Sequence, residues 1–408
     1  MGNIENQHHF PEIIWIENVI VNIDFINYFK NIFRVRTKMA GKIGILTAGN
    51  DVPGLNAAIR SIGKTAQNEF DMEIIGFQDG FHGLIENQYI PMKGPEFSGI
   101  LIAGGTFLGT SQVLPDNTIK DPNLLDKAVS TYKHHQLDAL VCLGGAEMQV
   151  GTLALSEAGL NVIGIPKSID NDVYGTDFTI GFDTALSVST EAVDRLHSTA
   201  HSHHRIIVVE ILGKHTGWLT LGAGMAGGAD VILIPEIPYH LNNIAQAILE
   251  RNQAGKRFSI IAVSDGALTQ ESVEFFRRNR EYNMRIRQGE ERKIIEDRLS
   301  TIENEYGDNT NLLSHFLHQK TGLETKVTIL GFLLRGGVPS AVDRMRATQF
   351  GSASVKKFTE GDFGILLGIN NFQISSTPLK DIAGKHNPLP PDHEWLKAAR
   401  NVGTCFGD

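Results

Sequence analysis

The stretch Leu160-Asn-Val-Ile-Gly-Ile165-Pro-Lys167-Ser168-Ile-Asp170-Asn-Asp172 joins an apolar run to a loop that carries two carboxylates. The run from Leu160 to Ile165 is typical of a strand that is buried on both faces of a parallel sheet. Open parallel sheets bind their ligands in the loops at the carboxyl ends of their strands. The stretch therefore predicts an α/β fold in which Asp170 and Asp172 lie at a ligand-binding edge.

Carboxylates two residues apart can divide the work of a phosphoryl transfer. One can take the proton of an attacking hydroxyl, while its neighbour holds the magnesium ion that neutralises charge on the phosphoryl oxygens. The same string can be a plain turn, because Asp and Asn side chains hydrogen-bond their own backbone and favour loops. The residues of this loop alone leave both interpretations open.

Similar apolar runs recur along the chain, and helix-like stretches such as Thr184 to Ala200 lie between them. This alternation predicts parallel α/β sheets, and 408 residues exceed the size of a single hydrophobic core, so we expect two domains. The charged segment from Gln270 to Gln319 predicts a solvated pair of helices. The expected strands cover Lys42 to Thr47, Ala139 to Leu143, Asn161 to Ile165, Ile206 to Ile211, Val231 to Ile234, Ser259 to Val263, Val327 to Leu330 and Gly364 to Leu367.

The composition argues against several classes of protein. The formal net charge of -9 disfavours non-specific nucleic-acid binding, which needs a basic face. The two cysteines, Cys142 and Cys405, form neither a disulfide framework nor a zinc-ligand pattern, which suits the reducing cytoplasm. Polar residues interrupt every apolar run in residues 1–38, so we expect no targeting segment and no membrane span. We interpret residues 1–38 as an N-terminal extension outside the fold, with no role that the sequence assigns.

Glycine-containing turns follow several expected strands. They are Gly49-Asn50, Gly104-Gly105 and Gly144-Gly145-Ala146-Glu147. Glycine lets backbone N–H groups approach phosphate oxygens, and a following helix presents its positive end to the same anion. Any strand-to-helix turn favours glycine, however, and none of these turns matches the Walker lysine pattern or a full dinucleotide fingerprint. A single turn of this kind therefore favours a structural role over a phosphate site.

Cations that could bind an anionic substrate lie near the ends of later strands: Arg205, Lys214, Lys326 and Arg335. An Arg fork binds a phosphate with two parallel hydrogen bonds and Lys supplies a point charge, although such residues are also common on plain surfaces. Glu236 could accept sugar hydroxyls or pair with one of these cations. A histidine cluster has no carboxylate or cysteine at ligand spacing, so we favour a structural role over a metal site for His197, His201, His203 and His204.

Taken together, these segments resemble the phosphofructokinase family from about Lys42 to the C-terminus. The resemblance implies two Rossmann-like three-layer domains with parallel sheets, and a cleft that holds fructose 6-phosphate and a phosphoryl donor. We expect a donor-binding domain of residues 39–181 plus about 337–384, and a sugar-phosphate-binding domain of residues 182–336 plus about 385–408. The motifs are Pro53-Gly54-Leu-Asn56-Ala-Ala-Ile-Arg60, Gly104-Gly-Thr-Phe-Leu-Gly109-Thr110, Pro166-Lys-Ser-Ile-Asp-Asn-Asp172, His203-His-Arg205 through Val209-Glu210, Gly213-Lys214-His215, Pro235-Glu236 and Arg335-Gly-Gly-Val-Pro-Ser-Ala-Val-Asp343-Arg344.

The resemblance also implies roles for individual residues. Asp170 takes the position of the catalytic base that acts on the sugar 1-hydroxyl, with Ser168 and Lys167 beside it near the transferred phosphoryl group. Asp172 takes the position of a carboxylate that helps to organise Mg²⁺. The positions of the sugar-phosphate site are Arg205, Gly213, Lys214, Glu236, Lys326 and Arg335. Arg205 and Lys326 match cations that reach across a subunit boundary in a homodimer or homotetramer.

Donor-side positions depart from the family pattern. Asn50 replaces a glycine beside Gly49, and Gln112 stands where many members have a donor-contacting Arg. Ala146, after Gly144 and Gly145, replaces an Asp that lies near magnesium in the family, which leaves Glu147 as a substitute metal ligand together with Asp172. Each lost charge-assisted contact removes about 1.5 to 3 kcal/mol.

The choice of donor follows from two of these positions and from the family as a whole. ATP users usually have Gly at the position of Glu147, whereas pyrophosphate users typically have Asp there and Lys at the position of Lys167. Glu147 and Lys167 favour pyrophosphate as the donor, but the resemblance to the family as a whole favours ATP. We expect a glycolytic ATP-dependent 6-phosphofructokinase, with the pyrophosphate enzyme as the alternative. A third hypothesis is a catalytically weak regulatory or binding subunit, because the departures fall on the donor side while Asp170 is retained.

Overall fold

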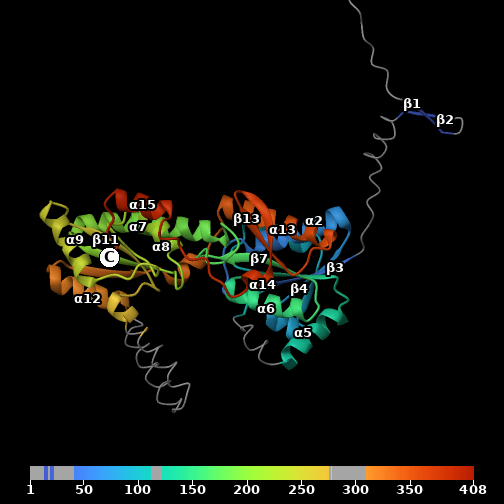
Figure 1. Ribbon diagram of the computed structural model, residues 1–408, viewed down its shortest axis with the longest axis horizontal. Coiled ribbons are helices and arrows are strands. Elements are labelled where there is room, and N and C mark those ends of the chain that lie inside the picture. Colours follow the sequence, from blue (N-terminus) through green and yellow to red (C-terminus); the bar gives the residue numbers. More distant parts are fainter. Residues whose placement is uncertain (1–12, 17–18, 23–40, 112–121, 275–276, 278–308) are drawn as a thin grey trace, which may run out of the picture.

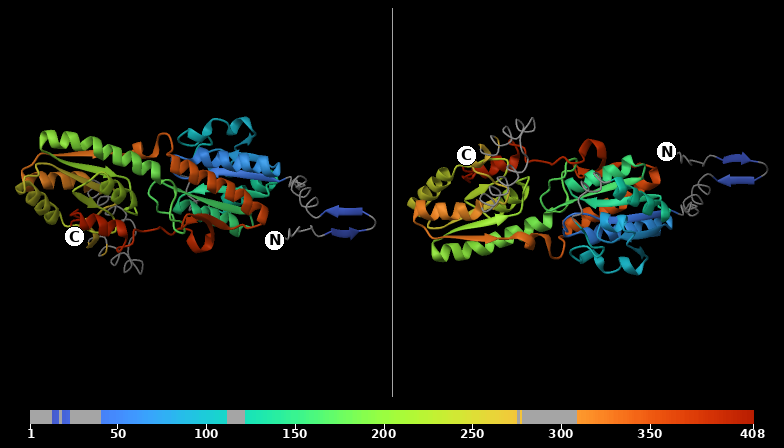
Figure 2. Two further views of the ribbon diagram at one scale, coloured as in Figure 1. Left: turned by 90° about the horizontal axis from the view of Figure 1, so that it is seen from above. Right: turned by 90° about the horizontal axis from the view of Figure 1, so that it is seen from below.

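The computed structural model describes residues 13–16, 19–22, 41–111, 122–274, 277 and 309–408. Two layered α/β units lie end to end along the long axis of the molecule, and each has a central sheet with helices on both faces (Figures 1 and 2). The strands β1 (Ile13–Ile16) and β2 (Val19–Asn22), in the N-terminal extension, form a separate antiparallel pair. Among the described residues, no helix combines the length and apolar character that a membrane span requires.

The larger sheet has the strand order β14-β13-β7-β6-β3-β4-β5, and β8 pairs with β7. Its inner strands run parallel to one another, whereas the edge strands β5 and β14 are antiparallel to their neighbours. Every residue of β6 is buried, as expected for a strand covered by helices on both faces. The strands are β3 (Lys42–Thr47), β4 (Glu73–Phe77), β5 (Tyr89–Met92), β6 (Ala139–Gly144), β7 (Val162–Ser168), β8 (Ile180–Gly181), β13 (Ile365–Asn370) and β14 (Gln373–Pro378).

Helices cover both faces of the larger sheet. On one face, α2 (Leu55–Phe70) and α13 (Ala341–Glu360) pack against each other and against the sheet, and on the other face lie α5 (Pro122–His134) and α6 (Ala146–Glu157) (Figure 1). The strand pattern explains the two layers, because alternate residues point to opposite faces. Ile43 and Ile45 thus belong to the core under α2, while Leu46 belongs to the core under α6.

The smaller sheet is parallel throughout, with the order β10-β11-β9-β12. The helices α7 (Phe182–His203), α8 (Trp218–Ala226) and α15 (Glu394–Asn401) cover one face, and α9 (Leu241–Gln253) and α12 (Asn309–Thr321) cover the other. The strands are β9 (Ile206–Ile211), β10 (Val231–Leu233), β11 (Ser259–Ser264) and β12 (Thr325–Ile329). The predicted fold class, two three-layer α/β units, is confirmed, with antiparallel edges on the larger sheet as an addition.

One sequence prediction about the fold needs correction. The segment from Gln270 to Gln319 is not solvated throughout, because Leu313 and Leu317 of α12 are fully buried in the core of the smaller unit. The rest of the predicted helical pair falls largely on residues 275–276 and 278–308, which lie outside the described residues. The two buried leucines are four residues apart and share a helix face. The sequence did not predict their burial because most of the residues around them are charged or polar.

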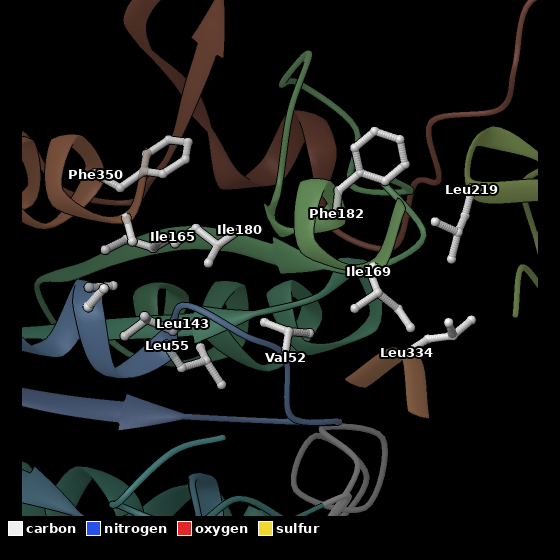
Figure 3. Packing of buried hydrophobic residues seen from close by; sticks show 14 of the residues in the cluster. Val52, Leu55, Leu143, Ile165, Ile169, Ile180, Phe182, Leu219, Leu334 and Phe350 are labelled. Atoms are coloured by element: carbon white, nitrogen blue, oxygen red, sulfur yellow. The ribbon is translucent and has the colours of Figure 1, made fainter. Parts of the chain in front are cut away.

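The two units share one buried apolar core and a polar junction. Ile169, in the loop after β7, belongs to the same core as Leu219 of α8 and Leu334 of the 3₁₀ helix η3 (Gly331–Arg335) (Figure 3). The fully buried Asp343 of α13 accepts hydrogen bonds from the backbone N–H groups of Gly181, at 3.0 Å, and of Thr184, at 2.8 Å. One carboxylate therefore joins the start of α13 to the start of α7. The predicted domain limits remain a prediction, although the chain does pass between the sheets near residues 181, 340 and 385.

Candidate active site

A cavity of ≈ 490 Å³ lies between the two units, where the carboxyl ends of strands from both sheets face each other. The larger unit supplies the loops after β3, β6 and β7, and the smaller unit supplies the loops after β9 and β11. Most of the predicted site residues line this cavity: Gly49, Asn50, Gly145, Ala146, Glu147, Lys167, Ser168, Asp170, Asp172, Gly213, Lys214 and Arg335. Residues predicted separately from distant parts of the chain thus lie around one space.

Asp170 has the properties of a carboxylate that can accept a proton. Its Oδ1 atom is sealed from solvent and has no hydrogen-bond partner among the described residues. Burial raises the pKa of Asp170 to about 7, and repulsion from the carboxylates of Asp172 and Asp265 adds to the shift. A carboxylate with a pKa near neutrality is suited to general base catalysis, because it both accepts and releases a proton near pH 7.

The pKa of Asp172 is shifted in the opposite direction to that of Asp170. Its Oδ1 atom accepts a hydrogen bond of 2.6 Å from Ser168 Oγ, and its Oδ2 atom lies 3.1 Å from Nδ1 of His386. Burial pushes the pKa of Asp172 upwards, but the hydrogen bonds from His386 and Ser168 outweigh it, so the pKa lies below its ordinary value. The two carboxylates of one loop therefore differ in character, since Asp172 stays ionised where Asp170 titrates.

Lys167 closes the donor side of the cavity. Its ammonium group is buried and donates a hydrogen bond to the backbone carbonyl of Asn50. Burial, followed by repulsion from Arg335, lowers the pKa of Lys167 to about 7. A methyl group on Gly49, which has a φ of +79°, would lie 3.3 Å from Nζ of Lys167 and 3.0 Å from Cγ of Met148. This turn thus requires glycine both for its backbone conformation and for the close approach of Lys167.

The rest of the donor side is more open. Glu147 and Asn50 are exposed at the cavity, and Ala146 is buried in the first turn of α6. Gly144 is the last residue of β6 and does not line the cavity, while its carbonyl accepts a hydrogen bond from the side chain of Gln149. The predicted donor residue Gln112 lies outside the described residues.

The family model described as Phosphofructokinase matches residues 42–358. The chain belongs to the phosphofructokinase family. It is 45% identical over 378 residues to the ATP-dependent 6-phosphofructokinase of Propionibacterium freudenreichii subsp. shermanii, covering 91% of this chain and 100% of that relative. It is 44% identical over 372 residues to the ATP-dependent 6-phosphofructokinase of Spirochaeta thermophila, covering 90% and 97% respectively. The structure of phosphofructokinase from Saccharomyces cerevisiae aligns with a TM-score of 0.69 at 30% identity, over 84% of this chain and 45% of that longer chain.

Besides Gly144, three of the residues predicted for the sugar-phosphate site do not line the cavity. Arg205 and Lys326 both contact the carboxylate of Glu324 at the edge of the smaller sheet. Glu236 accepts hydrogen bonds at Oε1 from the backbone N–H groups of Gly217, at 3.0 Å, and Leu389, at 2.9 Å. Its partners are thus backbone groups, and the cation pair considered from the sequence does not occur among the described residues.

Two titratable residues of the cavity were not predicted from the sequence motifs. Asp265 follows β11 directly and accepts a hydrogen bond of 2.8 Å at Oδ1 from the backbone N–H of Gly213, and desolvation raises its pKa. The signal for it was present, because an Asp directly after a buried strand is the same pattern that singled out Asp170. His386 had no such signal, since it meets Asp172 only through the tertiary fold.

Proposed function

We propose that this chain is an ATP-dependent 6-phosphofructokinase, which transfers the γ-phosphoryl group of ATP to the 1-hydroxyl of fructose 6-phosphate in glycolysis. The observation that carries the proposal is Asp170, whose Oδ1 atom is buried without a partner among the described residues and whose pKa is raised to about 7 at the cavity. The relatives that match nearly the full chain carry the name of this enzyme. We place it in the cytoplasm.

In the proposed reaction, Asp170 accepts the proton of the sugar 1-hydroxyl as its oxygen attacks the γ-phosphorus of ATP. The new bond joins that oxygen to phosphorus, the bond to the β-phosphate oxygen breaks, and ADP leaves with the electron pair. Lys214, Arg335 and Lys167 line the same cavity and supply positive charge to the transferring phosphoryl group. Ser168 keeps Asp172 in place, as its hydrogen bond of 2.6 Å indicates.

The donor set of the cavity fits a magnesium ion that arrives with the nucleotide. Magnesium usually keeps several waters and binds one or two carboxylates together with substrate phosphates, so it does not need a complete protein cage. No cluster of three or more candidate ligands occurs in the described part of the chain, while Asp172 and Glu147 both line the cavity. We assign these carboxylates as the residues that hold Mg²⁺, which would neutralise charge on the phosphate oxygens.

The phosphate of fructose 6-phosphate needs cations to bind it, and two candidate cations lie at the surface of this chain. Arg205 and Lys326 lie outside the cavity, so we propose that they bind the sugar phosphate of a neighbouring subunit in a homodimer or homotetramer. Exposed apolar side chains at the end of β12 and in η3, including Ile329 and Phe332, support a subunit contact at this edge. We further propose Asp265 as an acceptor for sugar hydroxyls, and an indirect role for Glu236, through the backbone of Gly217 and Leu389.

Pyrophosphate remains the second candidate donor. Glu147 lines the cavity with its carboxylate exposed, where it would repel an additional nucleotide phosphate, and Lys167 fills space beside Gly49. The charge of Glu147 and the space that Lys167 fills both favour pyrophosphate, the smaller of the two donors. A binding subunit without turnover is the third hypothesis, because the substitutions Asn50 and Ala146 fall on this side of the cavity.

One assay separates these possibilities. The purified full-length protein is incubated with fructose 6-phosphate, Mg²⁺ and either ATP or pyrophosphate, with the Asp170→Asn variant as a control for contaminating kinases. Turnover with ATP that Asp170→Asn abolishes is the expected result. Turnover with pyrophosphate alone would overturn the donor assignment. A rise in melting temperature with fructose 6-phosphate, without turnover on either donor, would instead identify a binding subunit.

A further inference from the structure

The segment from Lys385 to Leu389 crosses the cleft between the two units. On the side of the larger unit, the backbone N–H of Asn387 donates a hydrogen bond of 2.8 Å to the carbonyl of Asp172. On the side of the smaller unit, the carbonyl of Asn387 accepts a hydrogen bond of 2.8 Å from Nε1 of Trp218, and the N–H of Leu389 donates to Glu236. This cleft segment is therefore tied to both walls of the active site.

His386 belongs to the cleft segment and lines the cavity. Its Nδ1 lies 3.1 Å from Oδ2 of Asp172, and a carboxylate oxygen can only accept, so Nδ1 carries the proton. Its ring packs on the ring of His215 with a centroid distance of 4.4 Å and an interplanar angle of 31°. His215 belongs to the loop after β9 that also carries Gly213 and Lys214.

These contacts fix the orientation of the Asp172 carboxylate from both of its oxygens. Ser168 occupies Oδ1 and His386 occupies Oδ2, so both oxygens of this buried carboxylate are hydrogen-bonded. Loss of the bond from His386 would leave a buried oxygen unsatisfied and let the carboxylate turn towards other groups of the loop. Asp170, two residues away, depends on the same loop for the position of its Oδ1, which has no hydrogen-bond partner within the described part of the chain.

We propose that His386 is a positioning residue for phosphoryl transfer, which locks the Asp172 carboxylate beside Asp170 and joins it to the sugar-binding loop through the ring of His215. The proposal rests on the proposed function. A residue of this kind acts on the geometry of the reacting groups, so its loss lowers kcat and leaves KM for fructose 6-phosphate nearly unchanged.

A pair of amide variants tests this role. Asn at position 386 places an N–H donor where Nδ1 of the imidazole lies, whereas Gln places it near Nε2. Both amides are polar and similar in size, so an effect on folding alone would be alike in the two proteins. We expect His386→Gln to lower kcat about 10- to 100-fold, and His386→Asn to recover most of that loss. Lys385→Gln, which changes an exposed neighbour on the same segment, is the matched control and should behave as wild type.

The outcomes are distinct for each hypothesis. Equal kcat values in the Asn and Gln variants, or a change confined to KM, would overturn the positioning role even if wild type turns over normally. The rise in melting temperature caused by fructose 6-phosphate should be the same in all the variants, because sugar binding does not use the His386 hydrogen bond. A wild-type protein without turnover on either donor would remove the proposed function and this role with it.

Discussion

Arg205 and Glu324 form an ion pair at the edge of the smaller sheet, with 2.6 Å between Nε of Arg205 and Oε2 of Glu324. Nζ of Lys326 lies 3.1 Å from the other oxygen of the same carboxylate. Both cations therefore pair with Glu324 at a place outside the cavity. Exposed ion pairs of this type are screened by water and contribute little, so a phosphate dianion can displace Glu324.

Replacement of Arg205 should weaken binding of the sugar phosphate. We expect Arg205→Gln to raise KM for fructose 6-phosphate about 10- to 100-fold with little change in kcat, because the lost charge-assisted hydrogen bond acts on bound substrate and transition state alike. Steady-state kinetics measure both constants. Arg257→Gln is the matched control, since Arg257 is an exposed arginine near the start of the neighbouring strand β11. An unchanged KM in Arg205→Gln would contradict the assignment.

Asp170→Asn should lower kcat by about two to four decades, because the amide cannot accept the proton of the 1-hydroxyl. Binding of fructose 6-phosphate should persist, since a base acts mainly in the transition state. Kinetics at saturating substrates give the loss in kcat, and the ligand-induced shift in melting temperature reports binding. A large increase in KM at normal kcat would show that Asp170 binds the sugar and does not act as the base.

The pH dependence of kcat/KM should report the titration of Asp170 in the free enzyme. Asp170 has its pKa raised to about 7, so below this pH it is protonated and cannot act as a base, and kcat/KM should fall towards tenfold per pH unit. Asp265 is one of the charges that raise this pKa, so Asp265→Asn should move the acidic limb to lower pH. A profile that stays flat down to pH 5 would assign the proton transfer to another group.

Glu147 should set the affinity for ATP. Glu147→Gln removes one of the two carboxylates assigned to Mg²⁺, so we expect KM for ATP to rise severalfold, because the ion then holds the donor phosphates less firmly. Glu157→Gln, at the exposed far end of the same helix α6, serves as the control. A fall in KM for ATP would instead show that Glu147 repels the donor phosphates, and would contradict its assignment as a magnesium ligand.

Asp343 should contribute to stability and not to chemistry. Its carboxylate accepts two backbone N–H groups and the hydroxyl of Thr184 at 2.5 Å, all within the buried junction between α7 and α13. Asp343→Ala leaves these donors unsatisfied, so we expect the free energy of unfolding to fall by about 2 to 5 kcal/mol. Urea unfolding at fixed protein concentration measures the change, with Asp381→Ala as an exposed control. A change below 1 kcal/mol would mean that water replaces the carboxylate.

Much of the larger unit could be predicted from the sequence, because its strands are short apolar runs and periodicity is a local property. The loop with Asp170 and Asp172 followed from its position behind β7. The leucines of α12 were concealed by the charged residues around them, and Glu236 was selected for its residue type although its carboxylate binds backbone groups.

The chain pattern by itself determined the alternation of strands and helices and the placement of carboxylates and glycines at strand ends. Only the tertiary structure decided which of these groups share one cavity, why Asp170 titrates near neutrality while Asp172 stays ionised, and that His386 reaches Asp172. The physical reason is that hydrophobic periodicity depends on neighbours along the chain, whereas a pKa and a hydrogen bond depend on neighbours in space. Those spatial neighbours come from both units and from the segment that crosses between them.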